Sequence, residues 1–171
     1  YNEPKTLDTA FDVMGDIVLS TAAQQYGGFT VPEVDKILAP YAKKSYDKYV
    51  QEFLQYSDKS WTGREEKAIE YALDKVRRDF DQGWQGIEYK LNTVGSSRGD
   101  YPFVTVTLGL GTGQFEKMCN ISLLEVHKGG QGRDGHKKPV LFPKIVFLYD
   151  ENIHGPGQCC EDVFEAGVDC S

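Results

Sequence analysis

The sequence predicts a mixed α/β fold, with long amphipathic helices in the first half and a strand–helix–strand unit in the second. Three observations support this prediction. Apolar residues recur at helical spacing through most of residues 1–93, two runs rich in β-branched residues follow, and a glycine-rich turn with a helix-period segment separates those runs. A strand, a helix and a second strand in this order imply parallel pairing.

The first predicted helix starts near Glu3-Pro4 and ends at about Gln25, before Gly27-Gly28. Proline is tolerated in the first turn of a helix, because the backbone N–H that it lacks would have no partner there. Residues at alternating spacings of four and three then form one apolar stripe, which consists of Leu7, Phe11, Met14, Val18 and Thr21.

The second predicted helix opens at Val31-Pro32-Glu33 and continues through Phe53. Pro40 is expected to kink it, because proline removes a backbone donor. Lys44 and Lys48 are one turn apart, so both ammonium groups face one way. This basic face is either solvated or a binding site. The predicted buried side holds Val34, Ile37, Leu38 and Tyr41.

The third predicted helix begins at Arg64, after a polar loop at 57–63. Gly83 and Gly86 interrupt it, at a cost in helix stability, and permit close approach of another element. Three long amphipathic helices leave wide apolar stripes, so we expect part of this surface to meet a larger protein or a second subunit. The apolar positions of this helix are Ile69, Leu73, Val76, Phe80, Ile87 and Leu91.

A loop of small and hydroxyl residues, Gly95-Ser96-Ser97-Arg98-Gly99, joins the third helix to a predicted strand at 103–108. Backbone N–H groups and a guanidinium in such a loop can bind a phosphate or a carboxylate. A glycine that ends the helix, followed by a simple turn, explains the same residues. Both interpretations remain open at this point.

The second half contains a glycine-rich turn, Gly109-Leu110-Gly111-Thr112-Gly113. Its spacing fits neither the dinucleotide-binding pattern nor the phosphate-binding loop with its lysine. A helix at 114–127 follows, and then a second buried strand at 145–149 and a short helix at 161–166.

Composition restricts the function classes. The chain has 171 residues, 40% of them hydrophobic and 26% charged, which is typical of a globular domain. A net charge of −7 argues against general binding of nucleic acid. No apolar run approaches the length of a membrane span, so we expect a cytoplasmic protein. The first residue is not Met, so we expect that the chain begins inside a longer one.

The cysteines and histidines do not form a recognisable metal or disulfide pattern. No Cys-x-x-Cys pair occurs, and the histidines stand in loop-like sequence. We therefore expect reduced thiols, no metal site and solvated loop histidines. The residues are Cys119, Cys159, Cys160, Cys170, His127, His136 and His154.

Several separated blocks of the sequence resemble one known family. The blocks are Thr21-Ala-Ala-Gln-Gln-Tyr-Gly-Gly28, Val34-Asp-Lys-Ile-Leu-Ala-Pro-Tyr41, Asn92-Thr93, Ser96-Ser97, Pro102-Phe-Val-Thr105, Gly132-Arg-Asp-Gly135 and Phe142-Pro-Lys144. In order and spacing they resemble the anaerobic (class III) ribonucleoside-triphosphate reductases over essentially the whole chain.

The resemblance implies part of a ten-stranded α/β barrel of the glycyl-radical enzyme type, in a homodimer. This family reduces ribonucleotides to deoxyribonucleotides for DNA synthesis. A radical-SAM activase makes a glycyl radical, which generates a thiyl radical on a central cysteine. Formate commonly supplies the reducing equivalents, a C-terminal zinc site supports the radical domain, and an ATP-binding cone is present in some members.

Most of those catalytic groups have no counterpart in this chain. The family's thiyl cysteine stands in a Met-Gly-Cys-Arg loop, which does not occur here, and none of the four cysteines matches a catalytic one. We therefore expect no catalytic residue in this segment and no turnover by this polypeptide alone. The resemblance divides it into a dimerisation and effector-specificity region at 1–93 and a βαβ portion of the barrel at 94–171.

The resemblance also assigns candidate binding residues. Lys5 and Lys48 look like the lysines that bind a deoxynucleoside triphosphate or ATP effector, and Asp16 falls where a relative has a polar effector contact. Ser96, Ser97 and Arg98 would relay the effector signal to the active site; phage members have Asn where Arg98 stands. Two hypotheses follow: a portion of the reductase, or a stand-alone deoxynucleotide-binding and dimerisation module. A hydrolase is not supported, because no Ser-His-Asp or Gly-x-Ser-x-Gly arrangement is visible.

Overall fold

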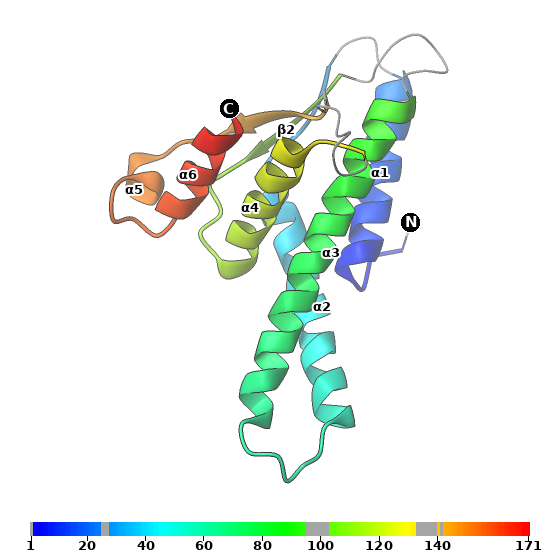
Figure 1. Cartoon of the computed structure of the whole chain (residues 1–171). Coiled ribbons are helices and arrows are strands. Elements are labelled where there is room, and N and C mark those ends of the chain that lie inside the picture. The colour runs from blue at the N-terminus through cyan, green and yellow to red at the C-terminus, as the bar shows by residue number, and fades with distance from the viewer. Residues whose placement is uncertain (1, 25–27, 95–102, 133–139, 141) are drawn as a thin grey trace.

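The computed structural model describes residues 2–24, 28–94, 103–132, 140 and 142–171. The chain is mixed α/β and mostly helical, with a small sheet at one end of the helices (Figure 1). The elements in chain order are α1 (Leu7–Gln24), β1 (Phe29–Val31), α2 (Val34–Tyr56), α3 (Arg64–Val94), β2 (Val104–Leu108), α4 (Gln114–Gly129), β3 (Lys144–Phe147), α5 (Glu151–His154) and α6 (Glu161–Cys170).

The sheet has three parallel strands in the order β1-β2-β3. Phe29 pairs with Val104 and Thr105 pairs with Lys144. The predicted parallel pairing of the two strands around α4 is thus confirmed, and the sequence prediction missed β1, whose residue Val31 it assigned to a helix start. The described residues form a three-stranded sheet, and they do not show the ten-stranded barrel that the resemblance implies.

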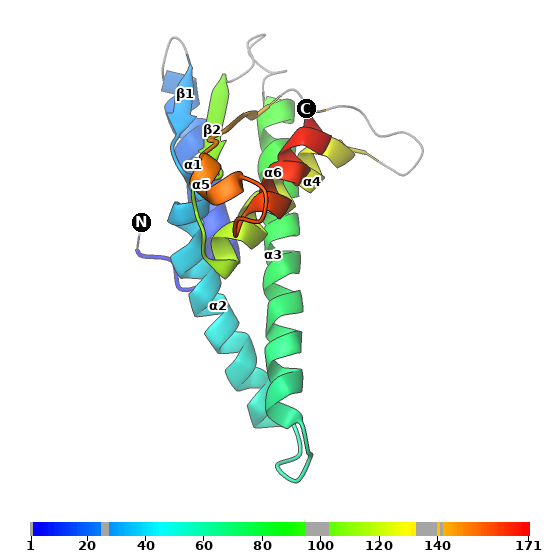
Figure 2. The same ribbon diagram turned by 90° about the vertical axis from the view of Figure 1, so that its left-hand side faces the viewer.

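Helices α2 and α3 form a long antiparallel hairpin whose tip projects beyond the rest of the molecule (Figures 1 and 2). The helix starts predicted at Arg64 and Gln114 are confirmed. Helix α1 lies along α3, and α4 packs against α2, α3 and α6. None of the helices in the described part of the chain is long and apolar enough to cross a bilayer.

The core between α1 and α3 is aromatic. Phe11 makes edge-to-face contacts with Phe80 and Trp84, at centroid separations of 6.0 and 5.1 Å. Gly83 permits this packing, because a Cβ there would lie 2.2 Å from Cδ2 of Phe11. The predicted close approach at Gly83 is confirmed, whereas a Cβ at Gly86 would meet nothing within 4 Å.

Four residues predicted to be buried are exposed. Ile37 and Ile69 lie on the outer faces of α2 and α3, Val146 on β3 is 44% exposed, and Tyr149, which follows β3, is 54% exposed. The prediction of a fully buried second strand was wrong because β3 is at an edge of the sheet and pairs only with β2 in the described part.

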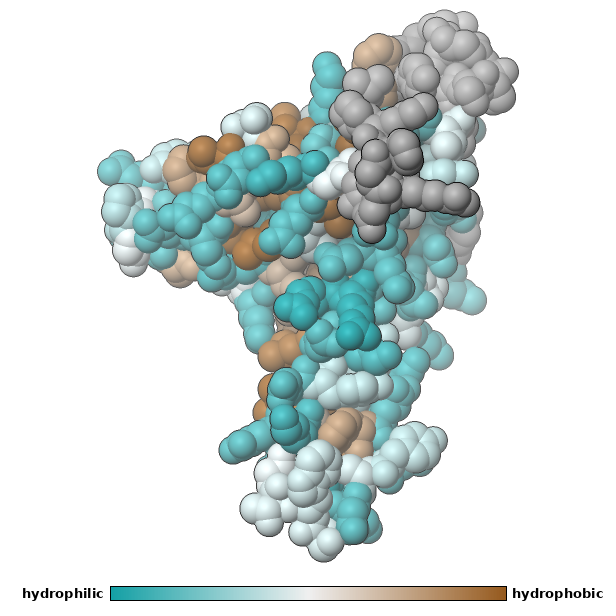
Figure 3. All heavy atoms as spheres, viewed as in Figure 1, coloured by the Kyte–Doolittle hydropathy of each residue, from teal (hydrophilic) through white to brown (hydrophobic). Residues whose placement is uncertain are grey.

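Hydrophobic residues nevertheless gather over the sheet and α4–α6 in Figure 3, while the visible face of α3 is mainly hydrophilic.

Candidate functional site: the α1–α2 junction and a buried carboxylate

The start of α1 is fixed to the middle of α2. The backbone N–H of Leu7 donates to Oγ of Ser45 at 2.7 Å in a buried position, and the ammonium of Lys44 pairs with Glu3 at 2.8 Å. Lys5 lies between those two attachment points along the chain, and Lys48 is one turn beyond Lys44 on α2. Lys5 and Lys48 are thus close along the chain to these two attachment points, and we call this region the α1–α2 junction.

Both junction lysines are available to a ligand. Lys5 is exposed, and the side chain of Lys48 is 57% exposed, with its ammonium 3.9 Å from a carboxylate oxygen of Glu52. An exposed ion pair at that distance contributes little to stability, so a polyanion can compete with Glu52 for the Lys48 ammonium.

Asp16 does not join the two lysines. Its carboxylate lies 3.9 Å from the ammonium of Lys90 on α3. Asp16 is eleven positions after Lys5, mostly within α1, and a helical rise of 1.5 Å per residue makes this about 16 Å along the axis. The structure therefore separates Asp16 from the junction by about three helical turns.

A groove of about 200 Å³ between α1 and α3 lies on the Asp16 side of the junction. Its charged lining consists of Asp8, Asp12, Asp79 and Lys90. Three carboxylates and one ammonium repel a phosphate group, so a nucleotide could place only its base or sugar here. The phosphates would need the exposed lysines of the junction.

Asp79 on α3 connects this groove with α2. The Tyr49 hydroxyl donates to Oδ2 of Asp79 at 2.6 Å. Partial burial raises the pKa of Asp79 above its usual value of 3.8, and the charge of Asp8 raises it further, whereas the bond from Tyr49 and the charges of Lys75 and Lys48 lower it. Burial, followed by the bond to Asp79, also raises the pKa of Tyr49.

This raised pKa predicts a pH dependence of stability. The folded state binds the Asp79 proton more tightly than the unfolded state, so the associated stabilisation is fully present below pH 3.8 and is lost as the pH rises through the raised folded value. Asp79→Asn removes the penalty on the ionised form. Its free energy of unfolding, relative to the wild type, should increase between about pH 3 and pH 6 in urea titrations.

Asp58 supplies a control of opposite sign. Hydrogen bonds from the backbone N–H and the hydroxyl of Ser60 lower the pKa of Asp58. The stability of Asp58→Asn relative to the wild type should therefore fall over the same pH interval. Equal slopes for the two variants would contradict the assignment of these pKa shifts.

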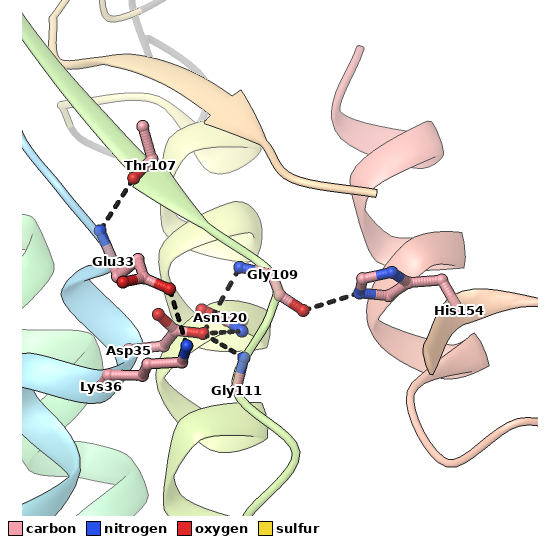
Figure 4. A network of polar contacts seen from close by, with 8 residues as sticks. All are labelled: Glu33, Asp35, Lys36, Thr107, Gly109, Gly111, Asn120 and His154. Carbon is pink, nitrogen blue, oxygen red and sulfur yellow. Dashed lines mark hydrogen bonds and ion pairs between the residues drawn. The ribbon is translucent and has the colours of Figure 1, made fainter. Parts of the chain in front are cut away.

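A second polar centre lies where the strands end at their carboxyl side. Asp35, in the first turn of α2, is fully buried. Its Oδ2 accepts from the backbone N–H of Gly111 at 2.8 Å and of Gly109 at 3.4 Å, and from Nδ2 of Asn120 at 3.1 Å (Figure 4). This group, which we call the Asp35 clamp, joins α2 and α4 to the turn after β2.

The local sequence explains the position of the clamp. A carboxylate in the first turn of a helix is stabilised by the helix dipole. Glu33, just before α2, has a left-handed backbone with φ of 44°, and its N–H donates to Oγ1 of Thr107 at 2.8 Å. Its carboxylate pairs with Lys36 at 2.7 Å. Two backbone N–H groups of the glycine-rich turn thus bind the Asp35 carboxylate. In nucleotide-binding motifs, the N–H groups of a glycine-rich turn bind a phosphate instead.

His154 supports the same turn from the opposite side. Its Nε2 donates to the carbonyl oxygen of Gly109 at 2.6 Å, and Nδ1 accepts from the N–H of Asp150 at 3.0 Å. The ring is 2% exposed, so the prediction of a solvated loop histidine was wrong. Gly109 itself has φ of 119°, and a Cβ there would lie 2.8 Å from the carbonyl oxygen of Leu148.

The prediction was also wrong for His127. It lies in the last turn of α4, and its Nδ1 is 2.7 Å from Oε1 of Glu88, which is fully buried on α3. His136 is outside the described residues. All four cysteines are free thiols, and the described residues contain no group of three His, Cys, Asp or Glu side chains placed to hold a metal ion.

Ser96, Ser97 and Arg98 lie outside the described residues, and so does the whole loop that we considered as a phosphate site. Sequence reasoning missed Asp35, Asn120, Glu88 and His154. Asp35 had a detectable signal, since it is an acidic residue in the first turn of a helix and the residues three and four positions later, Leu38 and Ala39, are apolar. The partners of Asn120, Glu88 and His154 are 39 to 85 residues away in sequence, so no local pattern marked them.

Comparisons with known proteins agree along the whole chain. Residues 1–171 match the family model for the anaerobic ribonucleoside-triphosphate reductase. The reductase of that name from Enterobacteria phage T4 is 37% identical over 153 residues, which are 88% of this chain and 24% of the relative. The one from Haemophilus influenzae is 30% identical over 98% of this chain and 23% of the relative, and the one from Escherichia coli is 29% identical over 98% and 22%. The chain thus spans about a quarter of the length of these relatives.

Proposed function

Because the chain belongs to the anaerobic ribonucleoside-triphosphate reductase family, we propose that it is a portion of an enzyme that makes deoxyribonucleotides for DNA synthesis. The match of the family model to every residue carries this proposal. We infer that this enzyme acts in the cytoplasm.

We assign different roles to the two parts of the chain. Residues 1–93, which include the projecting hairpin, serve dimerisation and effector specificity. Residues 94–171 are a βαβ portion of a ten-stranded catalytic barrel. The parallel strands β2 and β3 with α4 between them support the second assignment, because parallel strands connected by a helix are the repeating unit of α/β barrels.

The α1–α2 junction is our candidate for the effector's phosphates, with Lys5 and Lys48 as the ligating cations. Two observations support it: both lysines are exposed, and the bond between Leu7 and Ser45 fixes the start of α1, which Lys5 precedes, against α2, which carries Lys48. Asp16 would contact a donor on the base or the sugar. Residues 96–98 would relay the signal to the barrel.

The chemistry of ribose reduction is assigned to the longer protein. A glycyl radical made by a radical-SAM activase would start it, and a C-terminal zinc site would support the radical domain. We propose no catalytic, radical or metal residue within this segment, whose role is to bind the effector and to position barrel elements. The enzyme would be a homodimer.

Binding of nucleotides to matched lysine variants tests the effector site. Lys48→Ala and Lys43→Ala each remove an exposed ion pair to a residue four positions later on α2, Lys48 to Glu52 and Lys43 to Asp47. We expect Lys48→Ala to weaken the binding of a deoxynucleoside triphosphate about tenfold, which corresponds to about 1.4 kcal/mol, and Lys43→Ala to leave it within about twofold. Calorimetric titration with dATP, dGTP, dTTP and dCTP measures both.

The same titration separates the two functional hypotheses. It is run on the 171-residue chain and on the full-length reductase that carries it, with the oligomeric state recorded. Saturable binding by the chain alone supports an autonomous module, whereas binding only by the full-length protein supports a portion that requires the rest of the barrel. Unchanged affinity of Lys48→Ala in both would contradict the proposed effector site.

A further inference from the structure

The turn between α5 and α6 carries two adjacent thiols that the proposed function does not use. Cys159 is exposed, Cys160 is fully buried, and their sulfur atoms are 3.5 Å apart. The other two cysteines are elsewhere: Cys119 is buried in the core on α4, and Cys170 is in the last turn of α6. An accessible thiol beside a second thiol that can resolve a mixed disulfide is typical of redox-sensitive cysteine pairs.

We propose that Cys159 and Cys160 form a redox-modification site that exchanges with small-molecule disulfides and closes to a disulfide between the two neighbouring residues. The proposal is independent of the effector site and of ribose reduction. It rests on the sulfur–sulfur contact and on the unequal exposure of the two thiols.

The exchange takes place in two steps. The Cys159 thiolate attacks one sulfur of a disulfide RS–SR, so the S–S bond breaks, a mixed disulfide forms and one RS⁻ leaves. Cys160 then loses its proton and attacks Sγ of Cys159, and the second RS⁻ leaves. Two protein thiols are oxidised by two electrons, RS–SR is reduced to two RSH, and the two thiol protons go to the two leaving groups.

The surroundings assign the order of attack. Of these two thiols, only Cys159 is exposed to a disulfide in solution. Burial, followed by the hydrogen bond with Cys159, raises the pKa of Cys160 to about 11, which keeps this thiol protonated until a mixed disulfide forms beside it. Lys117 supplies positive charge at this turn: its ammonium donates to the carbonyl of Cys159 at 2.8 Å and pairs with Asp162 at 3.2 Å.

The closed form would be easy to reduce. The Cα atoms of neighbouring residues are about 3.8 Å apart, below the separation of roughly 4.4–6.8 Å that disulfides prefer, so ring closure distorts the backbone. Strained and exposed disulfides have the higher reduction potentials that are typical of reversible, regulatory bonds. The pair is thus suited to a switch, and not to a structural cross-link.

The switch would act on two neighbouring segments. The Cys160 N–H donates to the carbonyl of Ile153 at 3.0 Å, and the Cys160 carbonyl accepts from the N–H of Phe164 in the first turn of α6 at 3.2 Å. Its thiol is 3.7 Å from the carbonyl oxygen of Gly111, which belongs to the Asp35 clamp. Ring closure therefore strains the start of α6 and the turn after β2.

Mass spectrometry of the oxidised protein tests the proposal. The full-length protein, reduced and freed of reductant without oxygen, is incubated with oxidised glutathione, alkylated and digested with trypsin. The peptide that begins at Ile145 should carry a disulfide between Cys159 and Cys160, two hydrogen atoms lighter than the reduced pair, with Cys170 alkylated, and dithiothreitol should restore alkylation of Cys159 and Cys160. Cys160→Ser should instead retain one glutathionyl group on Cys159, and Cys159→Ser should react at least about tenfold more slowly at this turn.

Other outcomes would overturn the proposal. A stable glutathione adduct on the wild type would show that Cys160 does not resolve the mixed disulfide, and a bond from Cys159 to Cys170 would show a different partner. Cys170→Ser is the control and should behave as the wild type. The near-ultraviolet circular dichroism of each variant is compared first, and Cys160→Ala replaces Cys160→Ser if the serine disturbs the fold.

Discussion

Asp35→Ala should lower the free energy of unfolding by about 3–4 kcal/mol. The substitution leaves the N–H of Gly111 and Nδ2 of Asn120 without their buried acceptor, and each unsatisfied buried donor costs about 1–3 kcal/mol. The charge-assisted character of these bonds and the favourable position at the helix start are lost as well. Asp35→Asn keeps the shape but replaces a carboxylate oxygen by a donor, so we expect a loss of about 2 kcal/mol.

Urea unfolding monitored by circular dichroism measures both losses. Asp47→Asn is the matched control, because Asp47 is also on α2 and its side chain is 60% exposed in a pair with Lys43. It should change stability by less than about 0.5 kcal/mol. A loss below about 1 kcal/mol for Asp35→Ala would mean that the turn after β2 is held mainly by His154 and the sheet.

The second large effect is expected from two glycines of the same helix. Gly83→Ala places a Cβ 2.2 Å from the ring of Phe11, which contacts both Phe80 and Trp84 and is 3% exposed. The contacts with Phe80 and Trp84 restrict the ring, so we expect a loss of about 2–4 kcal/mol from overpacking, despite the better helix propensity of alanine. Gly86→Ala meets nothing within 4 Å and should stabilise by about 0.5–1 kcal/mol.

The two variants are chemically the same change, so their difference isolates the contact with Phe11. Thermal unfolding of both, with the wild type, gives the sign of each effect directly. A stabilising Gly83→Ala would show that α1 can move away from α3 at little cost. The variant Phe11→Leu combined with Gly83→Ala should recover part of the loss, because the smaller side chain leaves space for the new methyl group.

The helices were predictable because their pattern is long. The apolar period of α3 extends over a 31-residue helix, and the predicted start at Arg64 is the observed one. The apolar periods of α2 and α3 also predicted, wrongly, that Ile37 and Ile69 are buried. Periodicity identifies an apolar stripe, but it does not show whether another element covers each residue of the stripe. Strand β1 has three residues, too few for any period, and exists because Phe29 and Val31 pair with Val104 and Val106.

The candidate site was predictable only in part, for the same physical reason. Lys44 and Lys48 share one face of a helix through local geometry, and Lys5 was assigned by its resemblance to the family alone. The Asp35 clamp depends on contacts across 74 to 85 residues. The sequence showed that the glycine-rich turn does not fit a nucleotide-binding motif. It did not show that the Asp35 carboxylate binds the N–H groups of this turn.

The helical hairpin has a consequence for the folding pathway. Strands β1 and β2 are neighbours in the sheet, yet residues 32–103 separate them, and closing so long a loop costs configurational entropy. Because the contacts between α2 and α3 are local to the hairpin, we expect these helices to form first and to bring the two strands toward each other before they pair. This shortens the effective loop and lowers the entropic cost of pairing by about 1 kcal/mol. Substitutions that weaken the hairpin should therefore slow refolding, whereas those at β3 should mainly accelerate unfolding.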